Sequence, residues 1–177
     1  MRWRKAAAAG GAALGAAALY NVTASHRIAA LGNALGGERL ELDWRGNAVA
    51  YTRHGAGTPV LLVHGIHAGA SSLEWRHSVD ALAERHTVYA LDLLGFGCSA
   101  RPNLRYTPAM YQAFLADVMA KLGHGPLAVV ASAHSAALMI ALAARDPRHI
   151  AALALICPSG AGLLSNKEQT QLRASGY

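Results

Sequence analysis

Short segments of the chain have the patterns of apolar and polar residues that are typical of β-strands. Between them lie segments in which apolar residues recur at helical spacing. Residues 39–43 and 48–53 predict two strands joined by a hairpin turn at residues 45–47. Residues 59–63 form a continuous apolar run, which is typical of a strand buried on both faces of a parallel sheet. Further strands are predicted at residues 87–92, 127–131 and 150–157, and the last of these is expected to be buried.

Helical spacing of apolar residues predicts helices between these strands. The first begins behind Ser78 as its cap, and its face comprises Val79, Leu82, Ala83 and His86. The second runs from a cap and first-turn proline at residues 107–108 to Gly123, and the third covers residues 134–145. Alternating strands and helices indicate an α/β fold with a mostly parallel sheet of about six strands.

Composition narrows the class of protein. With 177 residues, 53% of them hydrophobic, and a mean hydropathy of +0.22, the chain is long and apolar enough for one folded core. Cys98 and Cys157 are too few for a disulfide framework or a four-ligand zinc site. His54, His64 and His67 have no Cys or carboxylate at ligand spacing, so we expect neither a metal nor another cofactor.

The net charge of +6 has its densest cluster at the amino terminus. Arg2, Arg4 and Lys5 supply three of the 16 basic residues, and the others are scattered singly without interleaved aromatic residues. We therefore expect no nucleic-acid partner.

Residues 1–27 have the pattern of a targeting segment, in which a basic start precedes the uncharged residues 6–24. That stretch is at the lower limit of a membrane span, and its Ala and Gly residues favour insertion only weakly. Three interpretations stay open: an uncleaved anchor with a cytoplasmic basic end, a signal peptide cleaved before Ser25, and an Ala-rich helix or tail outside the membrane. The first two predict an anchored or exported protein of a bacterial-type cell envelope.

Chemistry in a parallel α/β sheet collects at the carboxyl ends of the strands. Here residues 64–67 begin with His64-Gly65-Ile66, residues 92–99 form a glycine-containing loop, and residues 131–135 form a small-residue turn before a helix. In this order the three motifs resemble those of the α/β-hydrolase superfamily, and the similarity covers about residues 38–165. It implies a small-molecule substrate and hydrolysis of esters, with lactones and epoxides as further candidates.

The resemblance implies two backbone donors for a developing oxyanion. One is the N–H of Ile66, which Gly65 allows to approach closely. The other is the N–H of His134, if residue 133 occupies the nucleophile position. We interpret His64 as a ring packed under this loop, because the family's catalytic base comes later in the chain.

The resemblance also implies that residues 92–99 line the pocket. Gly95 and Gly97 are expected to form a tight loop around Phe96. Asp92 is interpreted as an acceptor that orders this loop and not as a general base.

The expected nucleophile is where this chain departs from the family pattern, which places a serine on a strained strand-to-helix turn between small residues. In the register favoured by both flanking prolines, Pro126 and Pro147, the position holds Ala133, whose methyl group cannot attack a carbonyl. In the other register the nucleophile is Ser135, and the strand is longer and the helix shorter. Without a catalytic role, Ser135 is a first-turn residue whose hydroxyl bonds backbone or solvent.

The acid and the base of the triad are also missing from the expected positions. After Ser135 the acids are Asp146 and Glu168 and the histidine is His149, and a helix of roughly 15 Å or more separates Asp146 and His149 from the turn. We expect a domain, residues 38–177, without its C-terminal strands and helices, in which residues 158–177 begin a cap or linker. Strand 150–157 would then be an apolar edge available to a partner.

Two functional hypotheses follow from these observations. In the first, the chain is part of a hydrolase of the carboxylic-ester type, either a fragment or a truncated protein, and is catalytically impaired at Ala133. In the second, it is a non-catalytic binding or scaffold protein that retains the pocket loops.

Overall fold

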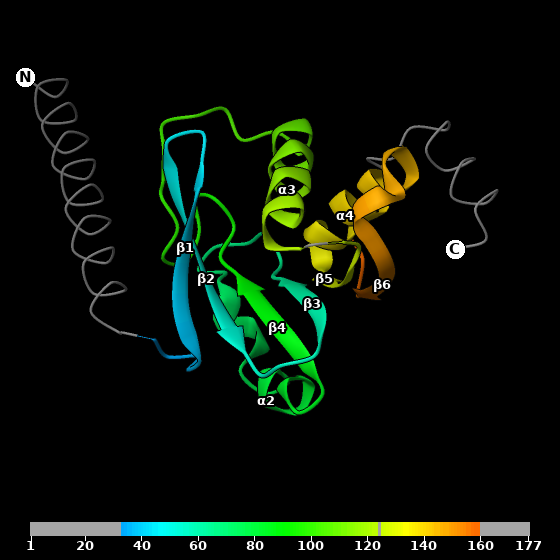
Figure 1. The fold of residues 1–177 in the computed structure, drawn as a ribbon. Coiled ribbons are helices and arrows are strands. Elements are labelled where there is room, and N and C mark those ends of the chain that lie inside the picture. The colour runs from blue at the N-terminus through cyan, green and yellow to red at the C-terminus, as the bar shows by residue number, and fades with distance from the viewer. Residues whose placement is uncertain (1–32, 124, 160–177) are drawn as a thin grey trace, which may run out of the picture. The chain divides into compact units, whose positions relative to one another are not determined.

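The computed structural model describes residues 33–123 and 125–159 (Figure 1). The chain divides into two units, Met1–Ala34 and Leu35–Tyr177, and the second contains the sheet. The predicted targeting segment, residues 1–27, lies outside the described residues, as does most of the predicted cap or linker, residues 158–177. Within the described part of the chain, no helix has the length and apolar character needed to span a membrane.

A six-stranded mixed sheet in the order β1-β2-β4-β3-β5-β6 forms the centre of the domain, which confirms the predicted fold class. The strands are β1 Glu38–Trp44, β2 Asn47–His54, β3 Thr58–Val63, β4 His86–Leu91, β5 Leu127–Ser132 and β6 Ile150–Ile156. Strands β3, β4, β5 and β6 run parallel, whereas β2 is antiparallel to both β1 and β4. The hairpin between β1 and β2 turns at Arg45 and Gly46, which both have positive φ as a tight two-residue turn requires.

The helices follow the predicted pattern with one correction. They are α2 Val79–Ala83, α3 Pro108–Leu122 and α4 Ala133–Arg145, with short 3₁₀ turns η1 Ser72–Trp75 and η2 Pro147–His149. The prediction that His86 lies on the face of the first helix is wrong, because this residue begins β4 and pairs with Thr58 of β3. Sheet pairing therefore overrides the helical spacing, and the side chain of Ser78 makes no capping hydrogen bond to the short helix that remains.

The apolar run of β3 is buried because both faces of the sheet are covered. Leu61 and Val63 belong to one core cluster, with side chains of α3 and α4, whereas Val60 and Leu62 belong to a second, with Trp75 of η1 and Val79 of α2. Successive side chains of a strand point to opposite faces, so a continuous apolar sequence fills both clusters. Figure 1 shows α2 and α3 on different sides of the strands.

Strand β6 differs from the expectation of a buried strand. Ile150 is buried, whereas Leu155 and Ile156 are 37% and 45% exposed. Within the described residues, β6 pairs with β5 along one edge only, so its other edge receives no strand. The prediction of burial is therefore wrong for this strand in the described part of the chain.

Candidate active site at the carboxyl ends of the strands

The loop after β3 and the turn after β5 touch each other at Gly65. A Cβ atom placed on Gly65 would lie 3.2 Å from the Cβ of Ala133 and 3.3 Å from the hydroxyl oxygen of Ser132. Such contacts are tighter than side chains normally tolerate, so glycine allows this close approach. The structure therefore brings the predicted oxyanion loop and the predicted nucleophile turn together.

The turn between β5 and α4 has its strained residue at position 133. Strand β5 ends at Ser132, and α4 begins at Ala133, whose φ of 48° lies in the left-handed region. This conformation costs an L-amino acid about 1–2 kcal/mol. A strained residue at a strand-to-helix junction is the geometry that exposes a side chain at the tip of a nucleophile elbow. In this chain that side chain is a methyl group.

The hydroxyl groups on either side of Ala133 are engaged by protein acceptors. Ser135 is fully buried, and its hydroxyl donates to the carbonyl oxygen of His64 at 2.6 Å. The hydroxyl of Ser132 donates to the Glu74 carboxylate at 2.5 Å. Neither hydroxyl is therefore presented at the tip of the turn.

The two predicted oxyanion donors lie on these same segments. The N–H of Ile66 follows Gly65 and has no acceptor among the described residues. The N–H of His134 belongs to the first turn of α4, where N–H groups have no acceptor within the helix. The side chain of His134 is exposed, with Nδ1 3.3 Å from the hydroxyl oxygen of Ser159.

His64 is a buried ring whose two nitrogens both face backbone groups. The N–H of Leu93 donates to Nε2 at 3.0 Å, so the proton of a neutral ring lies on Nδ1, which is 2.7 Å from the carbonyl oxygen of Gly65. The ring of Phe96 packs against His64 edge-on at 5.5 Å. Burial lowers the pKa of His64, although the Gly65 carbonyl and nearby carboxylates act in the opposite direction. His64 thus links the loops after β3 and β4.

Asp92 organises the loop after β4 through its carboxylate. Its oxygens accept from the N–H groups of Ser72 at 2.6 Å and Cys98 at 2.7 Å, and the residue is 6% exposed. Gly97 adopts φ 49°, and a Cβ atom there would collide with the Asp92 carboxyl group. The pair therefore requires glycine at position 97 and an acceptor at position 92.

Glu74 is a contributor that the sequence analysis did not single out. Besides the hydroxyl of Ser132, its carboxylate accepts from the N–H of Gly65 at 2.9 Å. It thereby connects η1 to the oxyanion loop and to the end of β5. In sequence it is one acid in an otherwise uncharged stretch, residues 64–75, and no pattern there indicates which backbone groups it bonds.

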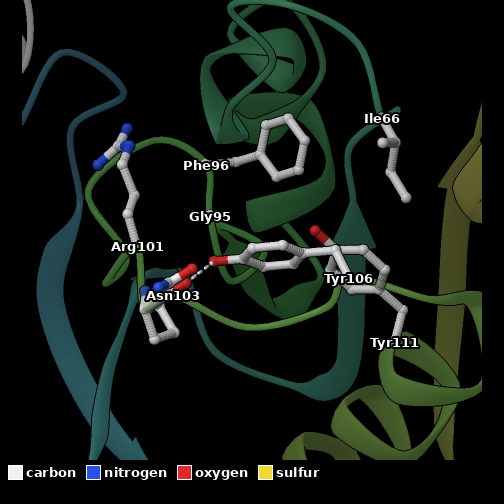
Figure 2. A pocket seen from close by; sticks show the side chains of 8 residues that line it. Ile66, Gly95, Phe96, Arg101, Asn103, Tyr106 and Tyr111 are labelled. Atoms are coloured by element: carbon white, nitrogen blue, oxygen red, sulfur yellow. Dashed lines mark hydrogen bonds between the residues drawn. The ribbon is translucent and has the colours of Figure 1, made fainter. Parts of the chain in front are cut away.

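A cavity of about 650 Å³ lies beside these loops (Figure 2). It is lined by residues of the loops after β3 and β4 and by the start of α3: Ile66, Gly95, Phe96, Arg101, Pro102, Asn103, Tyr106 and Tyr111. Three of these, Ile66, Gly95 and Phe96, were predicted as site residues. The cavity lining does not include the other predicted pocket-loop residues, His64, Gly65, Asp92 and Gly97, and it adds Arg101 and the two tyrosines.

No group of three or more His, Cys, Asp or Glu side chains in the described ranges is arranged to hold a metal ion.

The family model for the alpha/beta hydrolase fold matches residues 58–174. The chain belongs to this family. A 2-hydroxy-6-oxo-2,4-heptadienoate hydrolase from Pseudomonas putida is 34% identical over 104 residues, which are 58% of this chain and 38% of that enzyme. A haloalkane dehalogenase from Agrobacterium fabrum is 30% identical over 105 residues, which are 59% of this chain and 34% of that enzyme.

Solved structures show the same relationship. The crystal structure of a serine hydrolase involved in carbazole degradation superposes with a TM-score of 0.67 at 29% identity, over 71% of this chain and 49% of that one. The haloalkane dehalogenase DatA from Agrobacterium tumefaciens superposes with a TM-score of 0.63 at 28% identity, over 70% of this chain and 42% of that one. This chain thus spans less than half the length of these hydrolases.

Proposed function

We propose that this chain forms the oxyanion loops and pocket of a hydrolase site but has no nucleophile, and that it binds a small organic molecule without forming a covalent intermediate. The observation that carries the proposal is Ala133 at the strained turn between β5 and α4. A nucleophilic step needs an oxygen, sulfur or nitrogen at this position, and a methyl group supplies none. Ser135 is a poor substitute because it is buried and its hydroxyl bonds the carbonyl oxygen of His64.

The binding part of the proposal rests on groups that are independent of residue 133. The N–H groups of Ile66 and His134 lie at the carboxyl ends of adjacent parallel strands, where a carbonyl or another polarised oxygen would be bound. The cavity beside Ile66 has a volume in the usual range for small-molecule pockets. Relatives whose names describe a dienoate hydrolase and a haloalkane dehalogenase support a small organic electrophile as the ligand of the intact protein.

The test combines turnover with covalent labelling. We expect the chain to release no p-nitrophenol from p-nitrophenyl butyrate above the buffer rate and to gain no mass after incubation with a fluorophosphonate. Ala133→Ser restores a hydroxyl at the tip of the turn and is expected to gain a slow adduct on residue 133. Ser135→Ala serves as the matched control, because it removes the buried hydroxyl and leaves the turn unchanged.

The outcomes separate the two functional hypotheses. Ester hydrolysis or labelling by the unchanged chain that disappears in Ser135→Ala would show that Ser135 is a nucleophile and would overturn the proposal. An inert chain in which Ala133→Ser becomes labelled at position 133 would support it.

A further inference from the structure

The cavity beside the oxyanion loop contains one charged side chain among its described lining residues, that of Arg101. This guanidinium forms no ion pair with a described residue. Instead, it donates to two backbone carbonyls of its own loop, to Gly97 at 2.7 Å and to Ser99 at 3.3 Å. Arginine has five N–H donors, so these two bonds fix the orientation of the group and leave donors for a ligand.

The acid nearest to Arg101 in the loop sequence does not neutralise it by contact. Asp92 directs its carboxylate oxygens to the N–H groups of Ser72 and Cys98. It is also buried, whereas Arg101 is exposed. The cavity therefore has a positive charge with free hydrogen-bonding capacity, and none of its described lining residues is acidic.

The remaining wall of the cavity is largely aromatic. The ring of Tyr106 packs over Gly95, where an added Cβ atom would lie 3.1 Å from it, and stands 5.9 Å from the ring of Tyr111. The tyrosine hydroxyls are already bonded, that of Tyr106 to the carbonyl of Pro102 and that of Tyr111 to the carbonyl of Leu94, both at 2.9 Å. Their rings thus offer apolar surface.

The positive region and the far apolar residue lie on different sides of the cavity. In Figure 2, Arg101 and Ile66 lie at opposite sides of the pocket, and Phe96 and the ring of Tyr106 lie between them. Burial raises the pKa of Tyr106, and the positive charge of Arg101 acts against this rise, so the charge is felt at this part of the cavity. A ligand with an anionic head and an apolar body matches this arrangement.

We propose that the cavity binds a small organic carboxylate, with its acid group on Arg101 and its aromatic or extended apolar body along Phe96 and Tyr106 towards Ile66. A planar carboxylate can accept two N–H groups of the guanidinium fork at once, and such charge-assisted bonds are among the strongest in proteins. Because Ile66 also belongs to the oxyanion loop, the far end of the ligand lies at the residue whose N–H is the predicted oxyanion donor. In this respect the inference rests on the proposed function and names its ligand class.

The experiment measures binding of 4-phenylbutyrate to the complete 177-residue chain by isothermal titration calorimetry at low ionic strength. We expect the affinity for its uncharged amide, 4-phenylbutyramide, to be lower by a factor of about 10 at least. Arg101→Gln should weaken the binding of 4-phenylbutyrate by a similar factor and leave the binding of the amide nearly unchanged. Arg105→Gln is the matched control, because Arg105 is an exposed arginine outside the cavity lining and its replacement changes the net charge equally.

Circular dichroism first establishes that the variants are folded, and the binding results then decide whether Arg101 holds the carboxylate. Equal binding of the acid and the amide would overturn the proposal, as would an Arg101→Gln variant that binds the acid normally. An equal loss in Arg105→Gln would assign the effect to net charge and would also overturn it. An adduct on Ser135 of the unchanged chain in the labelling experiment would overturn the proposed function but not the role of Arg101, so the two failures are distinguishable.

Discussion

Ala133 holds a backbone conformation that its side chain does not favour. Its φ of 48° places it in the left-handed region, where glycine is accommodated without the steric cost that a Cβ atom brings. The strain persists because β5 and α4 fix the residues on both sides. In this chain the strained residue carries no reactive group, so a substitution that relieves the strain should not remove a catalytic side chain.

We expect Ala133→Gly to leave the free energy of unfolding unchanged or to raise it by up to about 1 kcal/mol, since relief of strain is partly offset by the greater freedom of glycine in the unfolded chain. Ala136→Gly is the control, because Ala136 is buried inside α4. It should lower the free energy of unfolding by about 1 kcal/mol or more. Urea unfolding followed by circular dichroism measures both. A larger loss in Ala133→Gly than in Ala136→Gly would contradict the assignment of strain to position 133.

The buried ring of His64 predicts a dependence of stability on pH. Burial holds its folded-state pKa below the ordinary value of 6.5, so the unfolded chain binds more protons between the lowered value and 6.5. The contribution of His64 to stability is therefore complete above pH 6.5 and is lost as the pH falls through the folded-state value. His54 acts in the same direction, because burial lowers its pKa as well.

Replacement of His64 by Asn should reduce the slope of unfolding free energy against pH, measured from pH 5 to pH 7, by up to about 1.4 kcal/mol per pH unit. The variant should also be about 1–3 kcal/mol less stable at pH 7, because the N–H of Leu93 loses its acceptor. His77→Asn, at an exposed position, is the control. An unchanged slope in His64→Asn would mean that another group causes the pH dependence.

At the scale of elements, the strands and the longer helices could be predicted from sequence because they follow simple periodicities. Residues 59–63 are apolar at every position, and the structure buries residues 60–63 between two layers. Contacts between distant segments produce no such periodicity in the amino-acid sequence. The hydrogen bonds of Glu74 and the orientation of Arg101 depend on where η1 and the loop after β4 lie in space, and only the fold determines that.

The loop after β4 gives a prediction at this scale, since Asp92 connects it to η1. Asp92→Asn replaces one acceptor oxygen by an NH₂ group, so one of the N–H groups of Ser72 and Cys98 loses its partner. We expect the free energy of unfolding to fall by about 1–3 kcal/mol. Faster amide hydrogen exchange should follow at residues 92–99. Glu41→Gln, which alters an exposed carboxylate on β1, should change neither quantity measurably; equal effects in the two variants would rule out a specific role for Asp92.

At the scale of the whole molecule, the described sheet has unequal ends. On one side the hairpin of β1 and β2 continues the sheet, and Trp44 is buried beside Phe114 of α3, with ring centroids 5.3 Å apart. On the other side β6 carries the apolar sequence of residues 150–156 with little cover from described residues. An apolar strand with an unpaired edge is a template for pairing with another chain.

We therefore expect the chain to associate as its concentration rises, and Ile156→Lys to weaken that association. Ile156 is 45% exposed on β6, and a lysine there introduces a charge that disfavours pairing between strand edges. Leu104→Lys is the matched control, because Leu104 is similarly exposed, at 44%, but lies in a loop. Sedimentation velocity over a range of concentrations measures the change, and any association through other segments is common to both variants. If the two lysine variants reduce association equally, general surface hydrophobicity is its cause, and the edge of β6 has no special part in it.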